Sequence, residues 1–141
     1  ISNFNIELTQ QAIDSIGLQH IETNQIELSP YLQNHRLVDF LQAQKIDVTS
    51  YMTLAYGKVL NDPVLLDIAA QHQASSAQIA LAWALQQGFA VIPSSTRREH
   101  LIANLAAQEI QLTKDEMTAI AKLDRNAREV NPEQLAPLWD E

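Results

Sequence analysis

The side chains of this sequence that could bind an anion follow one another in a single short segment. They are two serines, a threonine and two arginines: Ser94, Ser95, Thr96, Arg97 and Arg98. Hydroxyl groups donate hydrogen bonds to phosphate oxygens, and the planar guanidinium group of arginine matches the geometry of a phosphate. The segment is therefore a candidate phosphate-binding site.

The neighbouring residues predict a strand before this segment and a helix within it. An apolar run at 89–92 is typical of a buried strand. Thr96 and Glu99 have the spacing of a capping box, so we expect a helix to begin at Arg97. Its free amide groups and the positive end of its dipole would then point at the strand end. The alternative is an ordinary strand-loop-helix connection with solvated arginines, and the segment alone leaves both open.

The length and composition are those of one globular domain. The 141 residues are 46% hydrophobic and 18% charged, and the net charge of -8 argues against general binding to nucleic acid or anionic membranes. Because the chain has no cysteine and its histidines lack the spacing of metal ligands, we expect no metal site. No apolar run approaches the roughly 20 residues that cross a bilayer, and no signal-peptide pattern opens the chain, so a cytoplasmic protein is expected.

Predicted strands alternate with predicted helices along the chain. Apolar patterns predict strands at 24–28, 48–54 and 89–92. Helices are expected at 9–16 and 32–44, and further helices near Asp62, Ser75, Arg97 and Thr113. Residues 126–141 contain two prolines and little periodicity, which predicts a C-terminal loop. Repeated strand-helix units imply parallel strands, in either an open doubly wound sheet or a closed barrel.

Four motifs resemble, in order and approximate spacing, the C-terminal half of the aldo-keto reductases. They are Ile-Ser-Asn-Phe at 1–4, Asn-Gln-Ile-Glu-Leu-Ser-Pro-Tyr at 24–31, Ser-Tyr at 50–51 and Val-Ile-Pro-Ser-Ser at 91–95. The resemblance spans essentially the whole chain. It implies an α/β fold in which residues 1–141 form a single partial domain, the C-terminal half of a (β/α)8 TIM barrel.

A half-barrel is expected to need a partner. A complete barrel takes about 250 residues, and an open half exposes two sheet edges and one face. We therefore expect the chain to be a truncated part of a longer enzyme. It would pair with the missing N-terminal half or associate with itself.

The resemblance also implies that the chain binds NADPH, with NADH as the alternative cofactor. Ser2, Asn3 and Gln25 match the residues that bond to the nicotinamide carboxamide group, a planar group with both a donor and an acceptor. Tyr51 matches the aromatic residue that stacks on the nicotinamide ring. Leu54 lies in the loop expected to cross near the pyrophosphate.

The other end of the cofactor is expected on the segment that follows Pro93. The resemblance places the adenosine 2'-phosphate at Ser94, Ser95, Thr96 and Arg97, and the adenine at His100 and Asn104. Many family members carry lysine in place of Ser94 and arginine in place of His100. Because two cations are missing, we expect a weaker preference for NADPH over NADH.

The implied activity is the reduction of aldehydes or ketones, with methylglyoxal-like carbonyl compounds or 2,5-diketo-D-gluconate as substrates. The family's catalytic tyrosine, lysine, aspartate and histidine lie in its N-terminal half, so we expect no catalytic residue in this chain and no activity from it alone. Trp139 is the candidate substrate residue, because the C-terminal loop of the family closes over the substrate; the alternative is that it pins a loose terminus. The alternative function is a catalytically inactive nucleotide-binding or assembly module.

Overall fold

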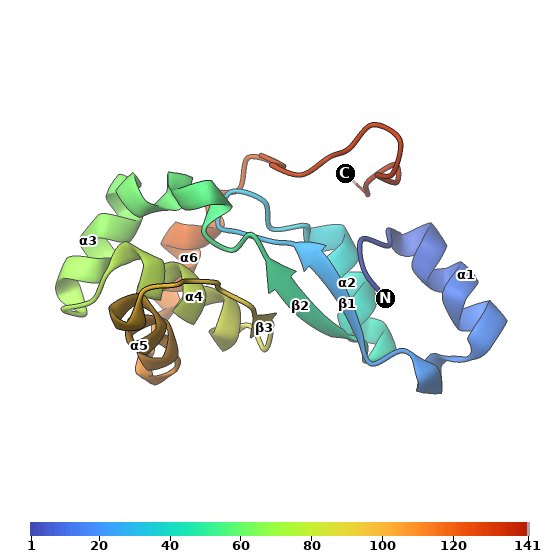
Figure 1. Ribbon diagram of the computed structural model, residues 1–141, viewed down its shortest axis with the longest axis horizontal. Coiled ribbons are helices and arrows are strands. Elements are labelled where there is room, and N and C mark those ends of the chain that lie inside the picture. Colours follow the sequence, from blue (N-terminus) through green and yellow to red (C-terminus); the bar gives the residue numbers. More distant parts are fainter. Residues whose placement is uncertain (141) are drawn as a thin grey trace.

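Three strands and six helices alternate along residues 1–140, the part of the chain that the computed structural model describes (Figure 1). The strands are β1 (Thr23–Glu27), β2 (Asp47–Tyr51) and β3 (Ala90–Val91). The helices are α1 (Ile6–Ile16), α2 (His35–Gln44), α3 (Pro63–Gln71), α4 (Ser76–Gln86), α5 (Arg98–Ala106) and α6 (Lys114–Ala121), with short 3-10 segments η1 (Leu18–His20), η2 (Ala55–Asn61) and η3 (Ala107–Glu109) between them. Within residues 1–140, no helix has both the length and the apolar character needed to span a membrane.

The three strands form one parallel sheet in the order β1-β2-β3. Their register sets Gln25 opposite Thr49 and Glu27 opposite Tyr51. Ser2 makes a single parallel bridge with Gln25, so the first residues lie beside β1 without forming a strand of their own. Parallel strands that alternate with helices confirm the expected α/β class.

One face of the sheet packs against helices, and the other face carries polar side chains. Ile26 and Val48 belong to the hydrophobic core, and α2 and α4 lie behind the sheet in Figure 1. Gln25, Thr49 and Tyr51 point to the opposite face, because side chains alternate along a strand, and each is only half-buried. The chemistry-bearing residues of β1 and β2 therefore share one side of the sheet.

Two helices that contribute to the core begin at the capping residues that the sequence predicts. Ser75 and Thr113 each form a complete capping box, with Gln78 and Glu116 as the reciprocal partners. The helix α4 that Ser75 caps is the most buried of the fold, and its Trp83 is 2% exposed, as expected for a core residue.

The capping box expected at Thr96 and Glu99 is not formed, and this prediction is wrong. The first residue of α5 is Arg98, and its N-cap residue Arg97 makes no side-chain cap hydrogen bond. The Glu99 carboxylate instead accepts a hydrogen bond from the Arg97 guanidinium at 2.7 Å, while the Arg97 amide donates to the Ser95 hydroxyl at 3.1 Å. The Arg97 guanidinium carries a full positive charge and a backbone amide only a partial one, so the Glu99 carboxylate pairs with the arginine.

The helix expected at 9–16 begins earlier, at Ile6, and two further predicted boundaries are wrong because of left-handed residues. The helix expected from residue 32 begins at His35, because Asn34 has a left-handed backbone with φ 47°. The strand expected to continue to residue 54 ends at Tyr51, because Met52 has φ 56°. Extended strands and right-handed helices both require negative φ, so each left-handed residue marks a boundary.

Residues 126–140 cross the carboxyl end of the sheet without forming a helix or a strand (Figure 1). Their last part lies beside the first helix. The Asn5 side-chain amide donates to the Leu138 carbonyl at 2.8 Å, and the Asp140 carboxylate accepts from the Ile6 amide at 2.8 Å. An aspartate at the first amide of a helix is favourable because of the helix dipole.

The two formed capping boxes and the absent one give a matched set of variants. Ser75→Ala and Thr113→Ala each remove a cap hydrogen bond, so each is expected to lower the free energy of unfolding by about 1 kcal/mol. Thr96→Ala is the control and should leave it nearly unchanged. Urea denaturation measures the shift in midpoint at constant slope. A loss from Thr96→Ala equal to that from Thr113→Ala would contradict the assigned start of α5.

Candidate functional site

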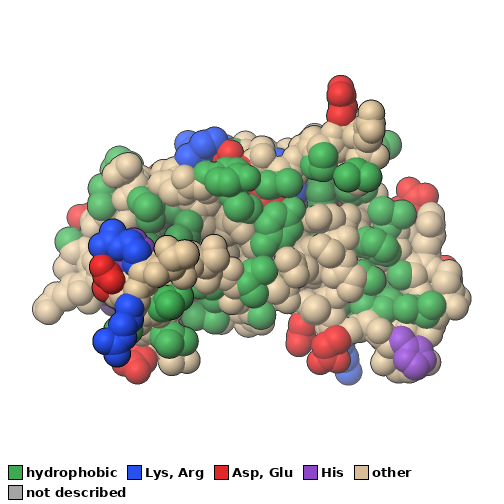
Figure 2. All heavy atoms as spheres, in the orientation of Figure 1, with side chains coloured by type: hydrophobic (Ala, Val, Ile, Leu, Met, Phe, Trp, Pro, Cys, Tyr) green, Lys and Arg blue, Asp and Glu red, His purple; other side chains and the backbone are tan. Residues whose placement is uncertain are grey.

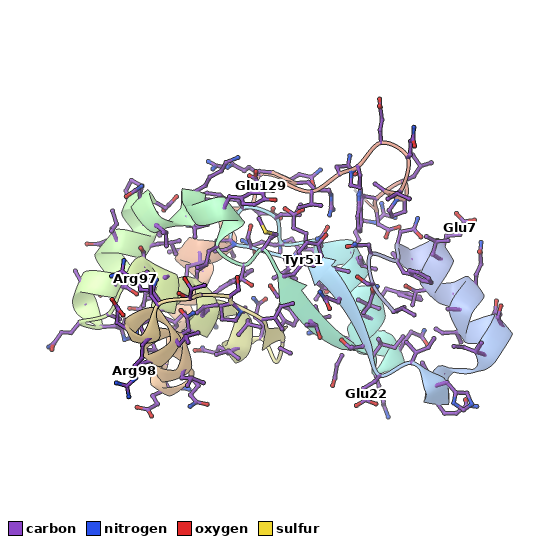
Figure 3. All side chains as sticks on the ribbon, viewed as in Figure 1. Glu7, Glu22, Tyr51, Arg97, Arg98 and Glu129 are labelled. Atoms are coloured by element: carbon purple, nitrogen blue, oxygen red, sulfur yellow. The ribbon has the colours of Figure 1, made fainter. Side chains whose placement is uncertain are left out.

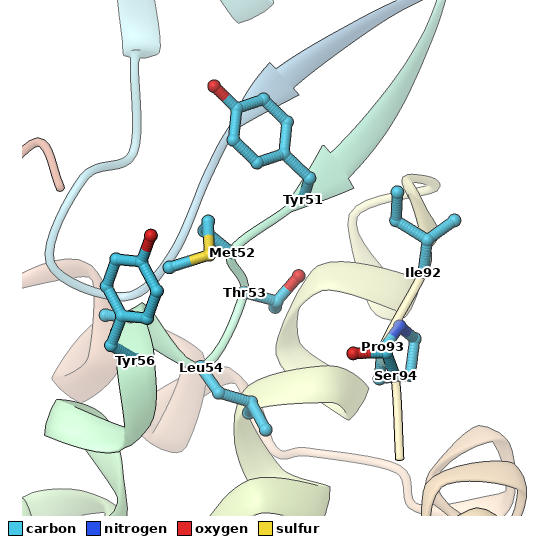
Figure 4. Close-up of a pocket in the computed structure, with 9 residues that line it drawn as sticks. Tyr51, Met52, Thr53, Leu54, Tyr56, Ile92, Pro93 and Ser94 are labelled. Atoms are coloured by element: carbon cyan, nitrogen blue, oxygen red, sulfur yellow. The ribbon is translucent and has the colours of Figure 1, made fainter. Parts of the chain in front are cut away.

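A cavity of about 320 Å³ opens where β2 and β3 end. One wall is the segment 51–56 that follows β2, and the other is the segment 92–94 that follows β3 (Figure 4). The close-up shows Tyr51 at the tip of β2, with Pro93 and Ser94 on the opposite strand connection. Because parallel strands end at the same edge of a sheet, this is the usual place for a binding site in such a fold.

A second cavity of about 410 Å³ continues from the first. Leu54 and Ser94 line both cavities, so the two adjoin. Its other lining residues include Ser95 and, from α5, His100 and Asn104. The two cavities together form an elongated groove, which we call the site groove, from Tyr51 to Asn104.

The wall of the site groove after β2 has an unusual backbone. Met52, Ala55 and Tyr56 have φ angles of 56°, 46° and 52°, and Gly57 has φ 85°. Tight turns hold this path, since the Ala55 amide donates to the Met52 carbonyl at 2.7 Å and the Gly57 amide to the Leu54 carbonyl at 2.7 Å. Left-handed residues other than glycine are costly and are retained where the surrounding structure fixes them, often at functional sites.

Buried hydroxyl groups fix the start of this wall to the sheet. Ser50 and Thr53 are both buried, and their side-chain oxygens lie 2.6 Å apart. The Ser50 hydroxyl also donates to the Leu28 carbonyl at 2.8 Å, beyond the end of β1. The connection after β2 is thus bonded to the neighbouring strand's end before it reaches the groove.

Tyr51 stands at the junction of the groove and the N-terminal residues. Its phenol donates to the Asn3 side-chain carbonyl at 2.9 Å. Burial raises the pKa of Tyr51, and the nearby charge of Glu27 raises it further. Tyr51 is therefore a neutral phenol at pH 7, available as a ring and a hydrogen-bonding group.

Ser2 and Gln25 complete this end of the site. The Ser2 hydroxyl donates to the Gln25 carbonyl at 3.1 Å, and the Asn3 amide donates to the same carbonyl at 2.9 Å. The structure thus brings Ser2, Asn3, Gln25 and Tyr51 together, although they are spread over 50 positions of sequence. Tyr51, which lines the groove, thus contacts a cluster of hydroxyl and amide groups through Asn3.

The two arginines of the candidate phosphate-binding segment are exposed at the start of α5. Arg97 and Glu99 form an ion pair at 2.7 Å, with side chains 63% and 64% exposed. Figure 3 shows Arg97 and Arg98 at α5, far from Tyr51. Thr96 is exposed beside them. The paired carboxylate offsets part of the positive charge that the sequence places at this end.

Two charged residues near the site, Glu27 and Arg128, were not among the candidate residues predicted from the sequence. Glu27 is 1% exposed, and its carboxylate accepts hydrogen bonds from the amides of Glu129 and Val130 at 2.7 and 2.8 Å. Arg128 donates to the Asn34 side-chain carbonyl at 2.9 Å. The only indication in the sequence concerned Glu27, which lies two positions after Gln25 and so faces the same side of the predicted strand.

Trp139 is partly buried against the hydrophobic core, and it also makes two contacts within the C-terminal tail. The Arg128 guanidinium lies 3.6 Å from the centre of its ring, and its indole N–H donates to the Asn131 side chain at 3.0 Å. Stacking of this kind fixes a segment that otherwise has no regular structure. Among residues 1–140, no group of three histidine, cysteine or carboxylate side chains could hold a metal ion.

Comparison with known proteins identifies the family. The sequence profile described as "Aldo/keto reductase family" matches residues 1–125. The chain belongs to the aldo/keto reductase family. Methylglyoxal reductase DkgB of Salmonella typhi is 57% identical over 140 residues, which are 99% of this chain and 52% of that protein. DkgB of Escherichia coli O157:H7 is 56% identical over the same share of both proteins, so this chain spans about half the length of these curated relatives.

Solved structures agree with this family assignment. A crystal structure of a candidate 2,5-diketo-D-gluconic acid reductase B superposes with TM-score 0.95 at 38% identity, over 100% of this chain and 50% of its own. A point mutant of Gox0644, in complex with NADPH, superposes with TM-score 0.89 at 34% identity, over 97% of this chain and 51% of its own. The expected fold is confirmed: this aldo/keto reductase chain has the structure of part of a TIM barrel.

The raised pKa of Tyr51 predicts how this residue titrates. Neutral Tyr51 is favoured in the folded state, so its contribution to the free energy of unfolding is fully present below its ordinary pKa of 10.0. That contribution is lost as the pH rises through the higher folded value. Ultraviolet titration of phenolate, taken as the difference between the protein and its Tyr51→Phe variant, should show an inflection above pH 10.0. An inflection below it would contradict the burial of this phenol.

Proposed function

We propose that the complete protein reduces small aldehydes or ketones with NADPH, and that this chain holds the cofactor. The observation that carries the proposal is the site groove, which runs from Tyr51, hydrogen-bonded to Asn3, to the start of α5. The relatives named methylglyoxal reductase and the neighbour crystallised with NADPH support it.

The groove fits an elongated nucleotide in size and chemistry. Its two adjoining cavities measure about 320 and 410 Å³, and small-molecule sites span roughly 300–1,000 Å³. One end offers an aromatic ring with amide and hydroxyl groups, and the other offers serine, histidine and asparagine side chains. NADPH would supply the hydride when bound, and the protein would supply its orientation.

Each residue at the Tyr51 end has a proposed role. The carboxamide of the cofactor would exchange hydrogen bonds with Ser2, Asn3 and Gln25, whose groups include both donors and acceptors. The Tyr51 ring would stack on one face of the nicotinamide and leave the other face open to the substrate. Leu54, which lines both cavities, would contact the middle of the cofactor.

The α5 end of the site groove would bind the adenosine, and its net positive charge is small. Ser94, Ser95 and Thr96 would donate to the 2'-phosphate, and Arg97 would pair with it. His100 and Asn104 would contact the adenine from α5. Since Glu99 already engages Arg97, we propose a preference for NADPH over NADH that is smaller than an unpaired arginine would give.

The proton donor would come from outside the matched half of the family. The raised pKa of Tyr51 makes it a weaker acid, its phenol already donates to Asn3, and its ring would stack on the nicotinamide, so we assign it no proton transfer. The chain covers 52% of the methylglyoxal reductase from Salmonella typhi, and we propose that the remaining part of the enzyme carries the catalytic groups. Trp139 would border the substrate from the tail.

An exposed apolar surface is the proposed contact with that remaining part. The helix α5 has no buried residue, and its Leu101, Ile102 and Leu105 are 43%, 56% and 69% exposed. Ile92, after β3, is 51% exposed and lines a cavity of about 490 Å³ together with Leu101 and Leu105. Apolar side chains also gather at this part of the molecule in Figure 2. Large exposed apolar patches usually mark a surface that another structure covers.

The role of Arg97 is tested by the ratio of kcat/KM for NADPH to kcat/KM for NADH. Arg97→Ala should lower kcat/KM for NADPH about two- to fivefold more than for NADH, as expected of one exposed charge pair. Glu99→Gln is the opposite control, because it releases Arg97 and should raise the ratio. Steady-state kinetics of the complete protein with methylglyoxal measures both variants. An unchanged ratio in Arg97→Ala would overturn this assignment.

The chain of residues 1–141 by itself tests whether this part binds the cofactor without carrying the catalytic groups. We expect quenching of its fluorescence by NADPH without any oxidation of NADPH by methylglyoxal. Retained binding with no turnover by the complete protein would instead favour an inactive nucleotide-binding module.

The apolar surface predicts that the same chain associates with itself. Light scattering should show particles larger than a monomer, and Leu105→Glu should shift them toward the monomer because it places a charge in the contact. Thr118→Glu, at an exposed position of α6, is the control. A monomeric starting protein would contradict the proposed contact.

A further inference from the structure

The tail is held at its base by a buried carboxylate. Glu27 lies at the end of β1, is 1% exposed, and accepts hydrogen bonds from two consecutive tail amides, those of Glu129 and Val130, at 2.7 and 2.8 Å. An ionised carboxylate that is withdrawn from water needs such donors. The backbone of the tail is therefore fixed at the carboxyl end of the sheet.

This fixed backbone directs the Glu129 side chain at the wall of the site groove. Both carboxylate oxygens of Glu129 lie 2.7 Å from the Lys58 ammonium nitrogen. The Glu129 side chain is only 12% exposed, while the Lys58 side chain is 56% exposed. Figure 3 shows Glu129 at the end of the sheet where Tyr51 lies.

Lys58 belongs to the same connection that shapes the groove. It directly follows Gly57, whose φ is 85°, and it stands in η2 after the left-handed residues Ala55 and Tyr56. Leu54, four positions earlier, lines both cavities. A displacement of Lys58 would therefore be transmitted to the groove wall through a short and tightly turned backbone.

We propose that Lys58 and Glu129 are positioning residues that couple the C-terminal tail to the cofactor groove. The pair clamps η2 to a tail backbone that Glu27 anchors, and so holds the wall at Leu54 in the shape that receives the cofactor. The inference rests on the proposed function. Since coupling between two sites is reciprocal, a bound cofactor also holds the tail in place.

The ion pair is suited to position a loop more than to stabilise the fold. A pair with one exposed partner contributes little to global stability, because water screens it and an ordered lysine loses rotamer freedom. The pair affects the conformation of the strained loop more than the stability of the whole fold, because it joins that loop directly to the tail. The effect should thus appear in cofactor affinity and in tail exchange before it appears in unfolding.

A double-mutant cycle in the complete protein tests the coupling. The variants are Lys58→Gln, Glu129→Gln, both together, and the exchange of the two charges by Lys58→Glu with Glu129→Lys. The Glu129 changes spare the backbone amide that Glu27 binds. Glu133→Gln, at an exposed tail position, is the matched control. Fluorescence titration gives the Kd for NADPH, and hydrogen exchange gives the protection of tail amides.

Each single variant should weaken NADPH binding about two- to fivefold, and the double variant should be no weaker than either single one. The charge exchange should recover most of the affinity, Glu133→Gln should have no effect, and NADPH should increase the protection of residues 126–140 only where the pair is intact. If the parent protein binds NADPH and the variants bind it equally well, the coupling is wrong. If the parent protein does not bind NADPH, the proposed function itself fails.

Discussion

The parallel pairing of β1, β2 and β3 is the constraint on which the site depends. Because the strands run the same way, the residues that follow them meet at one edge, and the register sets Glu27 directly opposite Tyr51. Gln25 and Tyr51 share a face for the same reason. A shift of β1 by one residue would turn Gln25 toward the helix-covered face, so that Gln25 and Tyr51 would no longer share a side of the sheet.

Polar groups at the carboxyl edge convert this arrangement into a rigid site. Hydroxyl bonds from Ser50 fix the start of the groove wall, and left-handed residues then turn it sharply toward Leu54. The buried carboxylate of Glu27 binds the tail from the other side. The same edge thus carries the site groove and the tail, and we propose that Lys58 and Glu129 couple the two.

Local sequence patterns predicted the helices and strands. They did not predict contacts between distant residues, or contacts in which two partners compete for one side chain. The capping boxes at Ser75 and Thr113 and the buried Trp83 follow from apolar periodicity and spacing, and the structure confirms them. Thr96 has the same spacing, but an adjacent arginine takes its glutamate. The role of Glu27 depends on tail amides about a hundred positions away, which no local pattern contains. The residue roles taken from the family resemblance remain predictions.

The central claim is that the site groove binds a nicotinamide nucleotide with its nicotinamide at Tyr51. A crystal structure of the complete protein with NADPH tests this most directly. We expect the nicotinamide ring against Tyr51, its carboxamide bonded to Asn3 and Gln25, and the adenosine beside Asn104. Nucleotide bound outside the groove, or bound with its two ends reversed, would contradict the account.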